Sequence, residues 1–355
     1  MRKYHVLTIV EKQNETPDSV WLSLAVPEDI VDEFAFLPGQ HLPLQISIDG
    51  KSVRRTYSIC SVPGEFPLRL GIRVQPGGVF SEYVQNELDI GDEIEVMPPF
   101  GRFHPTLDPD AEKSYFTFAA GSGITPILSI VGAILEQEPR SSIVLFYGNR
   151  RQRTTMFIDE LYALKNRFPE RLQLYFLFSQ EEQEFSIFSG RMEKSKVRDL
   201  WRAFCDGLKP DEAFICGPDS MIDNVKDVLI EIGMGDVSIY AERYGAPRRQ
   251  KPLRPDLRSG DKLATIDVIM DGHKKTFDMA SESGNIVDAA ADKGIDLPYS
   301  CKGGVCATCR THVREGEVTM AANFALEPWE VEEKFVLACQ SIPTTDKVVI
   351  DYDKT

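Results

Sequence analysis

The sequence has no apolar segment long enough to cross a bilayer and no apolar run at its start of the length found in signal peptides. Its most apolar stretch, Ile124 to Leu135, is too short to span a membrane and is typical of a buried helix. Low-complexity tracts and repeats of solenoid period are also missing. We therefore expect a globular, cytoplasmic protein that does not act at a membrane.

Basic charge is scarce as well. The chain has 40 Lys and Arg against 55 Asp and Glu, which gives a net charge of -15. Proteins that bind nucleic acid present a basic surface to the phosphates, so the composition argues against a nucleic-acid partner. A length of 355 residues predicts two or three domains of ordinary size, each with its own core.

Cysteine is infrequent and shows no disulfide framework. Three of the seven cysteines are scattered along the first two thirds of the chain: Cys60, Cys205 and Cys216. Unpaired cysteines of this kind agree with a reducing compartment.

The other four cysteines have the spacing of a plant-type iron–sulfur centre. Cys301, Cys306 and Cys309 form a C-x4-C-x2-C loop, and Cys339 follows at a distance. Two irons and two sulfides need four thiolates, three from one loop and one from a separate segment. A zinc site usually takes its ligands as two short pairs, and a redox dithiol at Cys306 and Cys309 leaves the other two without a role. The spacing therefore predicts a [2Fe–2S] cluster held by these four residues.

The patterning along the chain predicts a multidomain protein. The first hundred residues show short alternating strands between Pro and Gly turns, which favours an antiparallel barrel or sandwich. Strand and helix patterns then alternate, which predicts βαβ units and a parallel sheet. A Pro- and Arg-rich stretch without periodicity indicates a linker before a final α+β module. We predict a β-barrel domain at 1–105, an α/β nucleotide-binding domain at 106–244, a linker at 245–262 and a cluster domain at 263–355.

A short motif in the barrel region has the residue types that bind a flavin. In Arg55-Thr-Tyr57-Ser58, the guanidinium can pair a pyrophosphate, the ring can cover a flat flavin and the hydroxyl can reach a ring nitrogen. A strand tyrosine that packs on its neighbour is the alternative. Downstream, a Gly-Gly turn opens a helix whose free N–H groups suit a pyrophosphate. The candidate flavin residues are Arg55, Thr56, Tyr57, Ser58, Arg73, Gly77, Gly78, Val79 and Ser81.

Two turns in the α/β region suit a nucleotide. Gly121-Ser-Gly123-Ile-Thr125-Pro126 joins a buried strand to a helix, with Thr125 as the predicted N-cap. It departs from G-x-G-x-x-G because proline replaces the last glycine, so alone it is a weak signal. Cys216-Gly217 ends another strand, at the sheet edge where ligands bind.

Arginines after the strand that ends at Tyr147 bear on which nucleotide binds. Arg150 and Arg151 can hold a 2′-phosphate, which favours NADPH. They can equally be surface charges at the start of an exposed helix.

In this order, the motifs resemble those of the ferredoxin–NADP reductase superfamily, with a plant-type β-grasp ferredoxin fused at the C-terminus as in reductase components of bacterial oxygenases. The cysteine loop and the Arg54–Cys60 segment are most similar to the reductase subunits of phenylacetyl-CoA epoxidases. The resemblance implies FAD and a pyridine nucleotide at the residues named above, and an aromatic ring near the flavin at Tyr244. Phe is expected at that position, a mild departure. Gln180 stands where many NADPH-specific members have Arg, so NADH remains open.

The resemblance further implies an oxidoreductase that passes electrons from NADPH to FAD, to the [2Fe–2S] cluster and on to a partner oxygenase, the di-iron phenylacetyl-CoA epoxidase. It implies that Ser58 orients the flavin, that Cys216 flanks the nicotinamide and that Tyr244 moves to admit it. Two alternatives stay open: a reductase for a Rieske-type or other hydroxylase, and a non-enzymatic electron carrier or redox sensor.

Overall fold

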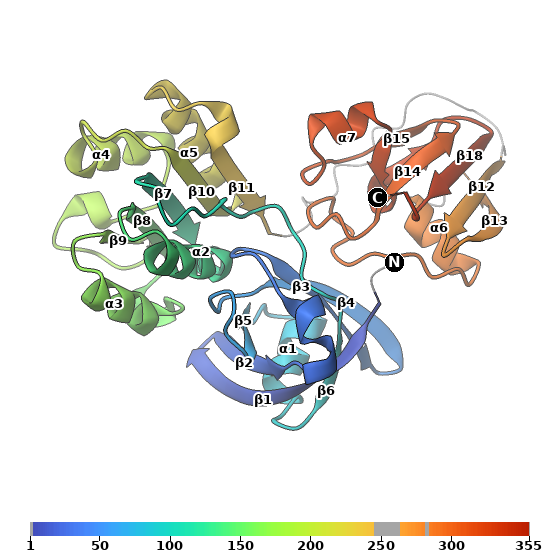
Figure 1. Cartoon of the computed structure of the whole chain (residues 1–355), viewed down its shortest axis with the longest axis horizontal. Helices are drawn as coiled ribbons and strands as arrows, with labels where there is room; N and C mark the ends of the chain where they lie inside the picture. Colours follow the sequence, from blue (N-terminus) through green and yellow to red (C-terminus); the bar gives the residue numbers. More distant parts are fainter. Residues whose placement is uncertain (1–2, 245–262, 281–283, 355) are drawn as a thin grey trace. The chain divides into compact units, whose positions relative to one another are not determined.

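The computed structural model describes residues 3–244, 263–280 and 284–354. The chain folds into two compact units (Figure 1). The first comprises Tyr4–Val53 and Tyr57–Tyr244, and the second contains Lys3, Arg54–Thr56 and the described residues after 262. Within the described ranges, no helix is long and apolar enough to span a membrane. The predicted linker at 245–262 lies outside the described residues.

The N-terminal part of the first unit is a six-stranded sheet in the order β4-β3-β6-β1-β2-β5. Antiparallel pairs join β1 to β2 and β6, and β2 to β5. An antiparallel bridge between Ile59 and Leu70 links the segment after β4 to β5 and closes the sheet, so the predicted antiparallel barrel is confirmed. Its elements are β1 (His5–Thr16), β2 (Ser19–Ala25), η1 (Glu28–Phe34), β3 (His41–Ile48), β4 (Lys51–Ser58), β5 (Leu68–Arg73), α1 (Val79–Asn86) and β6 (Glu93–Val96).

The rest of the first unit is a parallel sheet in the order β11-β10-β7-β8-β9, as predicted. Its strands are β7 (Ser114–Ala120), β8 (Ser142–Asn149), β9 (Leu172–Phe178), β10 (Glu212–Gly217) and β11 (Ile239–Arg243). The helices are η2 (Gly121–Gly123), α2 (Ile124–Gln137), η3 (Gln152–Thr154), α3 (Ile158–Arg167), η4 (Ser186–Phe188), α4 (Lys194–Phe204), α5 (Asp219–Glu231) and η5 (Asp236–Ser238).

Both faces of this sheet are buried, which explains the nearly continuous apolar sequence of β7. Successive side chains of a strand point to opposite faces. Tyr115 and Ala119 accordingly pack with α2 and α3, whereas Phe116 and Phe118 pack with α4 and α5. Helix α4 buries three side chains, Val197, Leu200 and Trp201, on this second face.

The second unit is a five-stranded mixed sheet in the order β13-β12-β18-β14-β16, with a separate β15-β17 pair. Strand β12 pairs in parallel with β18, and α6 contributes Ile286, Val287 and Ala290 to the core of this unit. The α+β prediction is confirmed, but α7 and the short strands β15, β16 and β17 were not predicted. Their three to five residues are too few to show a period.

The elements of the second unit, in chain order, are β12 (Leu263–Met270), β13 (His273–Ala280), α6 (Ile286–Asp292), β14 (Arg310–Glu315), β15 (Val318–Met320), α7 (Pro328–Glu332), β16 (Phe335–Leu337), η6 (Ala338–Gln340), β17 (Ser341–Pro343) and β18 (Lys347–Asp351).

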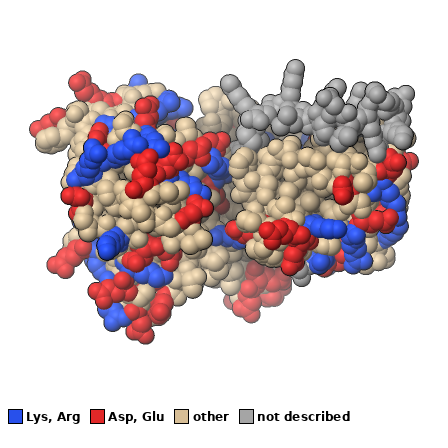
Figure 2. Space-filling model, turned by 90° about the horizontal axis from the view of Figure 1, so that it is seen from above, with Lys and Arg blue, Asp and Glu red and all other residues tan. Residues whose placement is uncertain are grey.

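Charged side chains of both signs are interspersed on the face shown in Figure 2. Opposite charges also pair on the surface between α4 and α5, where Arg198 and Lys194 both contact the carboxylate of Glu231. These two cations lower the pKa of Glu231 to about 2. The Glu231 carboxylate therefore stays ionised over the whole physiological range.

Candidate active site and cluster loop

Three hydroxyl groups from distant parts of the sequence meet in the first unit. The hydroxyl oxygen of Tyr244, which follows β11, lies 2.8 Å from Oγ of Ser58 and 3.0 Å from Oγ1 of Thr125. Ser58 ends β4 and Thr125 lies in the first turn of α2. The structure thus brings two predicted catalytic residues, Ser58 and Tyr244, together with one predicted nucleotide residue.

A carboxylate fixes the direction of these hydrogen bonds. Oγ of Ser58 donates to Oε2 of Glu242 at 3.3 Å, because an ionised carboxylate can only accept. With its single proton so used, Ser58 accepts from the hydroxyl of Tyr244. Burial is the main cause that raises the pKa of Tyr244 well above its ordinary value, so the phenol keeps the proton that it donates.

Glu242 also faces a histidine. Its Oε1 lies 3.5 Å from Nδ1 of His41, and both side chains are largely buried. Nε2 of His41 is buried with no hydrogen-bond partner among the described residues. A buried polar atom in this condition fits a site that a bound polar group or water completes.

Sequence reasoning assigned no role to either residue, although Glu242 stands two positions before Tyr244. What links Glu242 to the site is the pairing of two strands: β11 runs parallel to β10, and Glu242 lies opposite the predicted site residue Cys216.

Cys216 lies fully buried at the end of β10, beside the turn that begins α2. A Cβ atom on Gly123 would lie 2.1 Å from the carbonyl oxygen of Cys216, so only glycine lets this turn approach the strand so closely. Burial, and after it the charge of Glu242, raises the pKa of the Cys216 thiol well above its ordinary value. The thiol is therefore protonated at neutral pH.

The turn itself differs in one respect from the prediction. Helix α2 begins at Ile124 with Gly123 as its N-cap, so the prediction of Thr125 as N-cap was wrong. The 3-10 turn Gly121–Gly123 runs directly into the helix and moves the cap forward. The hydroxyl of Thr125 instead donates to the carbonyl of Ser122 at 3.1 Å and faces Tyr244.

The remaining nucleotide candidates lie along the carboxyl edge of the parallel sheet. Gly121 has a left-handed φ of 56°, and its carbonyl accepts from the hydroxyl of Tyr147 at 2.9 Å. Gly217 ends β10, the strand that carries Cys216.

At the end of β9, an open cavity of about 360 Å³ is lined by Phe178, Ser179, Gln180, Glu181, Glu182, Gln183, Ser186, Ser189 and Gly190.

Arg150 and Arg151 are exposed. The backbone of Arg150 is hydrogen-bonded to a residue that lines this cavity, because its carbonyl accepts the N–H of Gln180 at 2.9 Å. This arrangement suits cationic side chains that reach a phosphate bound at the edge of the sheet.

The flavin candidates divide into those on β4, namely Arg55, Thr56, Tyr57 and Ser58, and those at or near the turn that begins α1. The ring of Tyr57 packs at 5.6 Å from the ring of Phe80 in α1, so the alternative of strand-tyrosine packing is realised in part. Arg55 is exposed, with its Nη1 donating to the carbonyl of Arg54, and Thr56 is half-buried.

The predicted Gly-Gly turn that opens a helix is present, and its role toward a pyrophosphate stays a prediction. Gly78 caps α1, and the first helical hydrogen bond runs from the N–H of Glu82 to the carbonyl of Gly78, so the N–H of Val79 opens the helix outside that ladder. The N–H of Gly77 donates to the carboxylate of Glu82 at 2.7 Å. The hydroxyl of Ser81 accepts from the N–H of Gln75 and so braces the turn. The residues fit an anion at this helix terminus.

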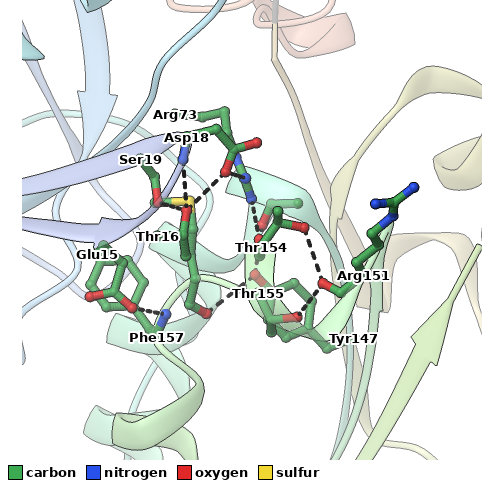
Figure 3. Close-up of polar contacts among 12 residues, drawn as sticks. Glu15, Thr16, Asp18, Ser19, Arg73, Tyr147, Arg151, Thr154, Thr155 and Phe157 are labelled. Carbon is green, nitrogen blue, oxygen red and sulfur yellow. Dashed lines mark hydrogen bonds and ion pairs between the residues drawn. The ribbon is translucent and has the colours of Figure 1, made fainter. Parts of the chain in front are cut away.

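Arg73, a flavin candidate, is occupied by protein groups. Its Nη1 pairs with Oδ1 of Asp18 at 2.5 Å and its Nη2 donates to the carbonyl of Thr154 at 2.9 Å (Figure 3). The guanidinium therefore joins the barrel to the segment after β8.

In the second unit, the cysteine loop turns its backbone toward sulfur. Left-handed residues Lys302, Gly304 and Ala307 wind the loop, and the N–H of Gly303 donates to Sγ of Cys301 at 3.2 Å. Hydrogen bonds first from the Cys306 thiol and then from the Cys339 thiol lower the pKa of Cys301.

The four thiols meet in one place. Cys339 contacts Cys301 and Cys309 as well, and Cys306, Cys309 and Cys339 are buried. Among the described residues, no group of three or more His, Cys, Asp or Glu side chains converges on a point that could hold a single metal ion. The four thiols would be shared between two irons, and the N–H of Gly303 already donates to one of the sulfurs, so the residues fit a [2Fe–2S] cluster although no three of them meet at one point.

Three family matches cover most of the chain. Residues 6–104 match the oxidoreductase FAD-binding domain, 118–227 the oxidoreductase NAD-binding domain, and 268–344 the 2Fe-2S iron-sulfur cluster binding domain. The chain is 39% identical to a subunit of the 1,2-phenylacetyl-CoA epoxidase of Escherichia coli over 99% of both chains. It belongs to this family of iron–sulfur flavoprotein reductases.

Other members and folds agree with this membership. The chain is 33% identical to the 3-ketosteroid-9-alpha-monooxygenase, ferredoxin reductase component, of Rhodococcus rhodochrous over 98% of this chain and 96% of that one. Its fold is similar to that of phthalate dioxygenase reductase, with a TM-score of 0.59 and 23% identity over 98% of both chains.

Membership in the iron–sulfur flavoprotein reductases establishes the cofactors and the class of reaction. The chain is an oxidoreductase with binding domains for FAD, NAD(P)H and a 2Fe-2S cluster, of the kind that serves as reductase component in oxygenase systems. The matched ranges lie inside the three predicted domains, whose boundaries stay predictions.

Proposed function

We propose that this reductase transfers electrons from NADPH through FAD and the [2Fe–2S] cluster to a di-iron oxygenase that epoxidises phenylacetyl-CoA, in the cytoplasm. The observation that carries the proposal is the 39% identity, over nearly the whole of both chains, with the phenylacetyl-CoA epoxidase component of Escherichia coli. FAD and the cluster supply the conversion of a two-electron donor into single electrons.

The hydroxyl network describes how the protein prepares the flavin site. Ser58 ends its strand with a buried hydroxyl, and Tyr244 holds that hydroxyl by donating to it. When the ring of Tyr244 moves to admit the nicotinamide, Ser58 is free to orient the flavin ring through a hydrogen bond. The Glu242 carboxylate accepts the hydrogen bond of Ser58 in the closed arrangement and can accept it again after Tyr244 returns.

Cys216 acts as a neutral group. Its burial keeps the thiol protonated, so it packs against the nicotinamide rather than attacking it. Gly121, Gly123, Thr125 and Gly217 would hold the nucleotide along the same edge, where glycine admits a close backbone approach.

The flavin is assigned to the barrel. We propose that Arg55, Thr56, Tyr57 and Ser58 contact it along β4. Its pyrophosphate would lie on the turn formed by Gly77, Gly78, Val79 and Ser81, supported by the open start of α1. Arg73 would act near this site through the contacts that it makes with Asp18 and Thr154.

Arg150 and Arg151 support NADPH as the donor, because the carbonyl of Arg150 accepts the N–H of Gln180, a residue that lines the cavity at the end of β9. The cluster is assigned to Cys301, Cys306, Cys309 and Cys339, whose thiols contact one another.

An anaerobic titration of the purified protein with NADPH, and separately with NADH, tests the order of carriers. We expect bleaching of a flavin spectrum followed by a rhombic [2Fe–2S] signal in low-temperature EPR, with NADPH effective at the lower concentration. Reduction of flavin with no cluster signal would leave a simple diaphorase and reject the proposal.

The acceptor is tested separately, by reconstitution with the oxygenase components of a phenylacetyl-CoA epoxidase. The 33% identity with a 3-ketosteroid-9-alpha-monooxygenase reductase component favours a different oxygenase as the second candidate. Phenylacetyl-CoA-dependent NADPH consumption supports the first, and its absence with intact reduction of the cluster supports the second.

A further inference from the structure

An eight-residue segment after β8, residues 150–157, is attached at both of its ends to functional parts of the first unit. We call it the strap. It follows the strand that ends at Asn149, carries three arginines and leads into α3.

The first end of the strap is tied to the cavity at the end of β9. The N–H of Gln180 donates to the carbonyl of Arg150 at 2.9 Å, and the N–H of Gln152 donates to Oε2 of Glu181, also at 2.9 Å. Gln180 and Glu181 both line the cavity. The position of the strap therefore sets where its Arg150 and Arg151 stand relative to the residues that line the cavity.

The second end of the strap is held by the barrel, as Figure 3 shows. Oε1 of Glu15 in β1 accepts the N–H of Phe157 at 2.6 Å. Arg73 in β5 donates to the carbonyl of Thr154 at 2.9 Å, and Asp18 between β1 and β2 pairs with the same guanidinium. Two strands of the flavin-binding barrel thus contact the strap through charged groups.

The barrel surface is shaped for this contact. Phe157 has a left-handed φ of 58°, a conformation that costs energy for a bulky residue and persists where its surroundings impose it. Its fully buried ring occupies the space beside Gly71 of β5, where a Cβ atom would lie 2.6 Å from the ring. Glu15 satisfies the N–H that this turn leaves at the start of α3.

The strap also reaches the nucleotide turn. The single hydroxyl proton of Tyr147 is shared between the carbonyl of Gly121 at 2.9 Å and the carbonyl of Met156 at 3.3 Å. Met156, the residue before Phe157, is therefore connected through the side chain of Tyr147 to the turn that begins α2.

We propose that Glu15 is a positioning residue for the pyridine nucleotide. By holding Phe157 it fixes the strap, and the strap in turn fixes its arginines relative to the cavity and to the Gly121 turn. In this way the flavin barrel sets the affinity for the nucleotide. This inference rests on the proposed function, because it takes the cavity and the Gly121 turn as the nucleotide site. Glu15 does not touch the nucleotide itself.

The test is calorimetric titration of the FAD-loaded protein with NADP+, which binds without reacting. In Glu15→Ala the N–H of Phe157 loses its acceptor, and transmission of about 1 kcal/mol of that loss to nucleotide binding predicts about a fivefold rise in Kd. Glu15→Gln keeps an acceptor oxygen and is expected to bind within twofold of the wild type. The matched control is Asp92→Ala, which removes a carboxylate that accepts the N–H of Asp89 in the barrel, away from the strap; its Kd should not change.

The outcomes separate this inference from the proposed function. A wild-type protein that binds no NADP+ overturns both. A wild-type protein that binds NADP+ while Glu15→Ala binds equally well overturns the inference alone, even if the melting temperature of the variant falls. Should Glu15→Ala fail to fold, Glu15→Asp withdraws the carboxylate by one methylene and is expected to weaken binding about twofold to threefold; an unchanged Kd in that variant overturns the inference in the same way.

Discussion

The hydroxyl of Tyr244 lies 2.8 Å from the hydroxyl of Ser58, and the two residues are 186 positions apart in the chain. The bond connects the end of a barrel strand to the residue that follows the edge strand of the parallel sheet. It holds the Tyr244 ring in place together with the contact to Thr125.

Replacement of Tyr244 by Phe should make nucleotide binding easier. The variant loses the hydrogen bond that its hydroxyl donates to Ser58, worth about 1 kcal/mol, and the polar contact with Thr125, so its ring is displaced at lower cost. We expect the KM for NADPH to fall severalfold, with FAD retained, in a ferricyanide reduction assay. Tyr240→Phe is the control, since Tyr240 lies on the same β11 and its ring stacks on Phe214. An unchanged or raised KM in Tyr244→Phe contradicts a gating role.

The pH profile tests the state of Cys216. Burial and Glu242 raise the pKa of the thiol, so no thiolate forms between pH 6 and 9. Cys216→Ala is expected to lower kcat about tenfold through poorer positioning of the reacting groups. Because no ionisation is removed, the shape of the pH–rate profile in this range should be unchanged. A wild-type rate that rises toward pH 9, with a rise that Cys216→Ala abolishes, contradicts this assignment.

Nucleotide preference is tested at the arginines. Charge-assisted bonds to a phosphate contribute about 1.5–3 kcal/mol, so Arg150→Ala combined with Arg151→Ala should raise the KM for NADPH at least tenfold and leave that for NADH nearly constant. Arg202→Ala, an exposed arginine on α4, serves as control. Equal effects on both nucleotides would show that the arginines do not read the 2′-phosphate.

Loss of one cluster ligand should separate the two activities of the protein. Cys339→Ser is expected to abolish the EPR signal and electron transfer to a one-electron protein acceptor, while NADPH-dependent flavin reduction stays within about twofold of the wild type. Cys205→Ser, which changes a buried cysteine of the first unit, should leave both intact. A parallel fall of both activities with FAD retained would contradict the linear order of carriers.

Local patterns were sufficient for most of the framework. The short alternating strands of the first hundred residues predicted the antiparallel barrel, and the strand–helix alternation after them predicted the parallel sheet; the structure contains both.

The candidate site was predicted only where a motif names its residues. Ser58, Thr125, Cys216 and Tyr244 were expected, and Ser58, Thr125 and Tyr244 do meet. The contacts of Glu242 with Ser58 and His41 depend on how the barrel packs against the parallel sheet. No periodicity encodes that packing, and the same holds for the contact between Glu15 and Phe157.

The contacts between barrel and parallel sheet bear on how such reductases can be recombined. Glu15, Arg73 and Ser58 from the barrel each hold a group of the nucleotide-binding half. A chimera joined near Pro105 would pair each of these side chains with a foreign surface, although the family matches make that junction look natural. A crossover placed between residues 244 and 263 keeps all of these pairs within one parent, so the barrel and the nucleotide-binding half can be exchanged together as one cassette.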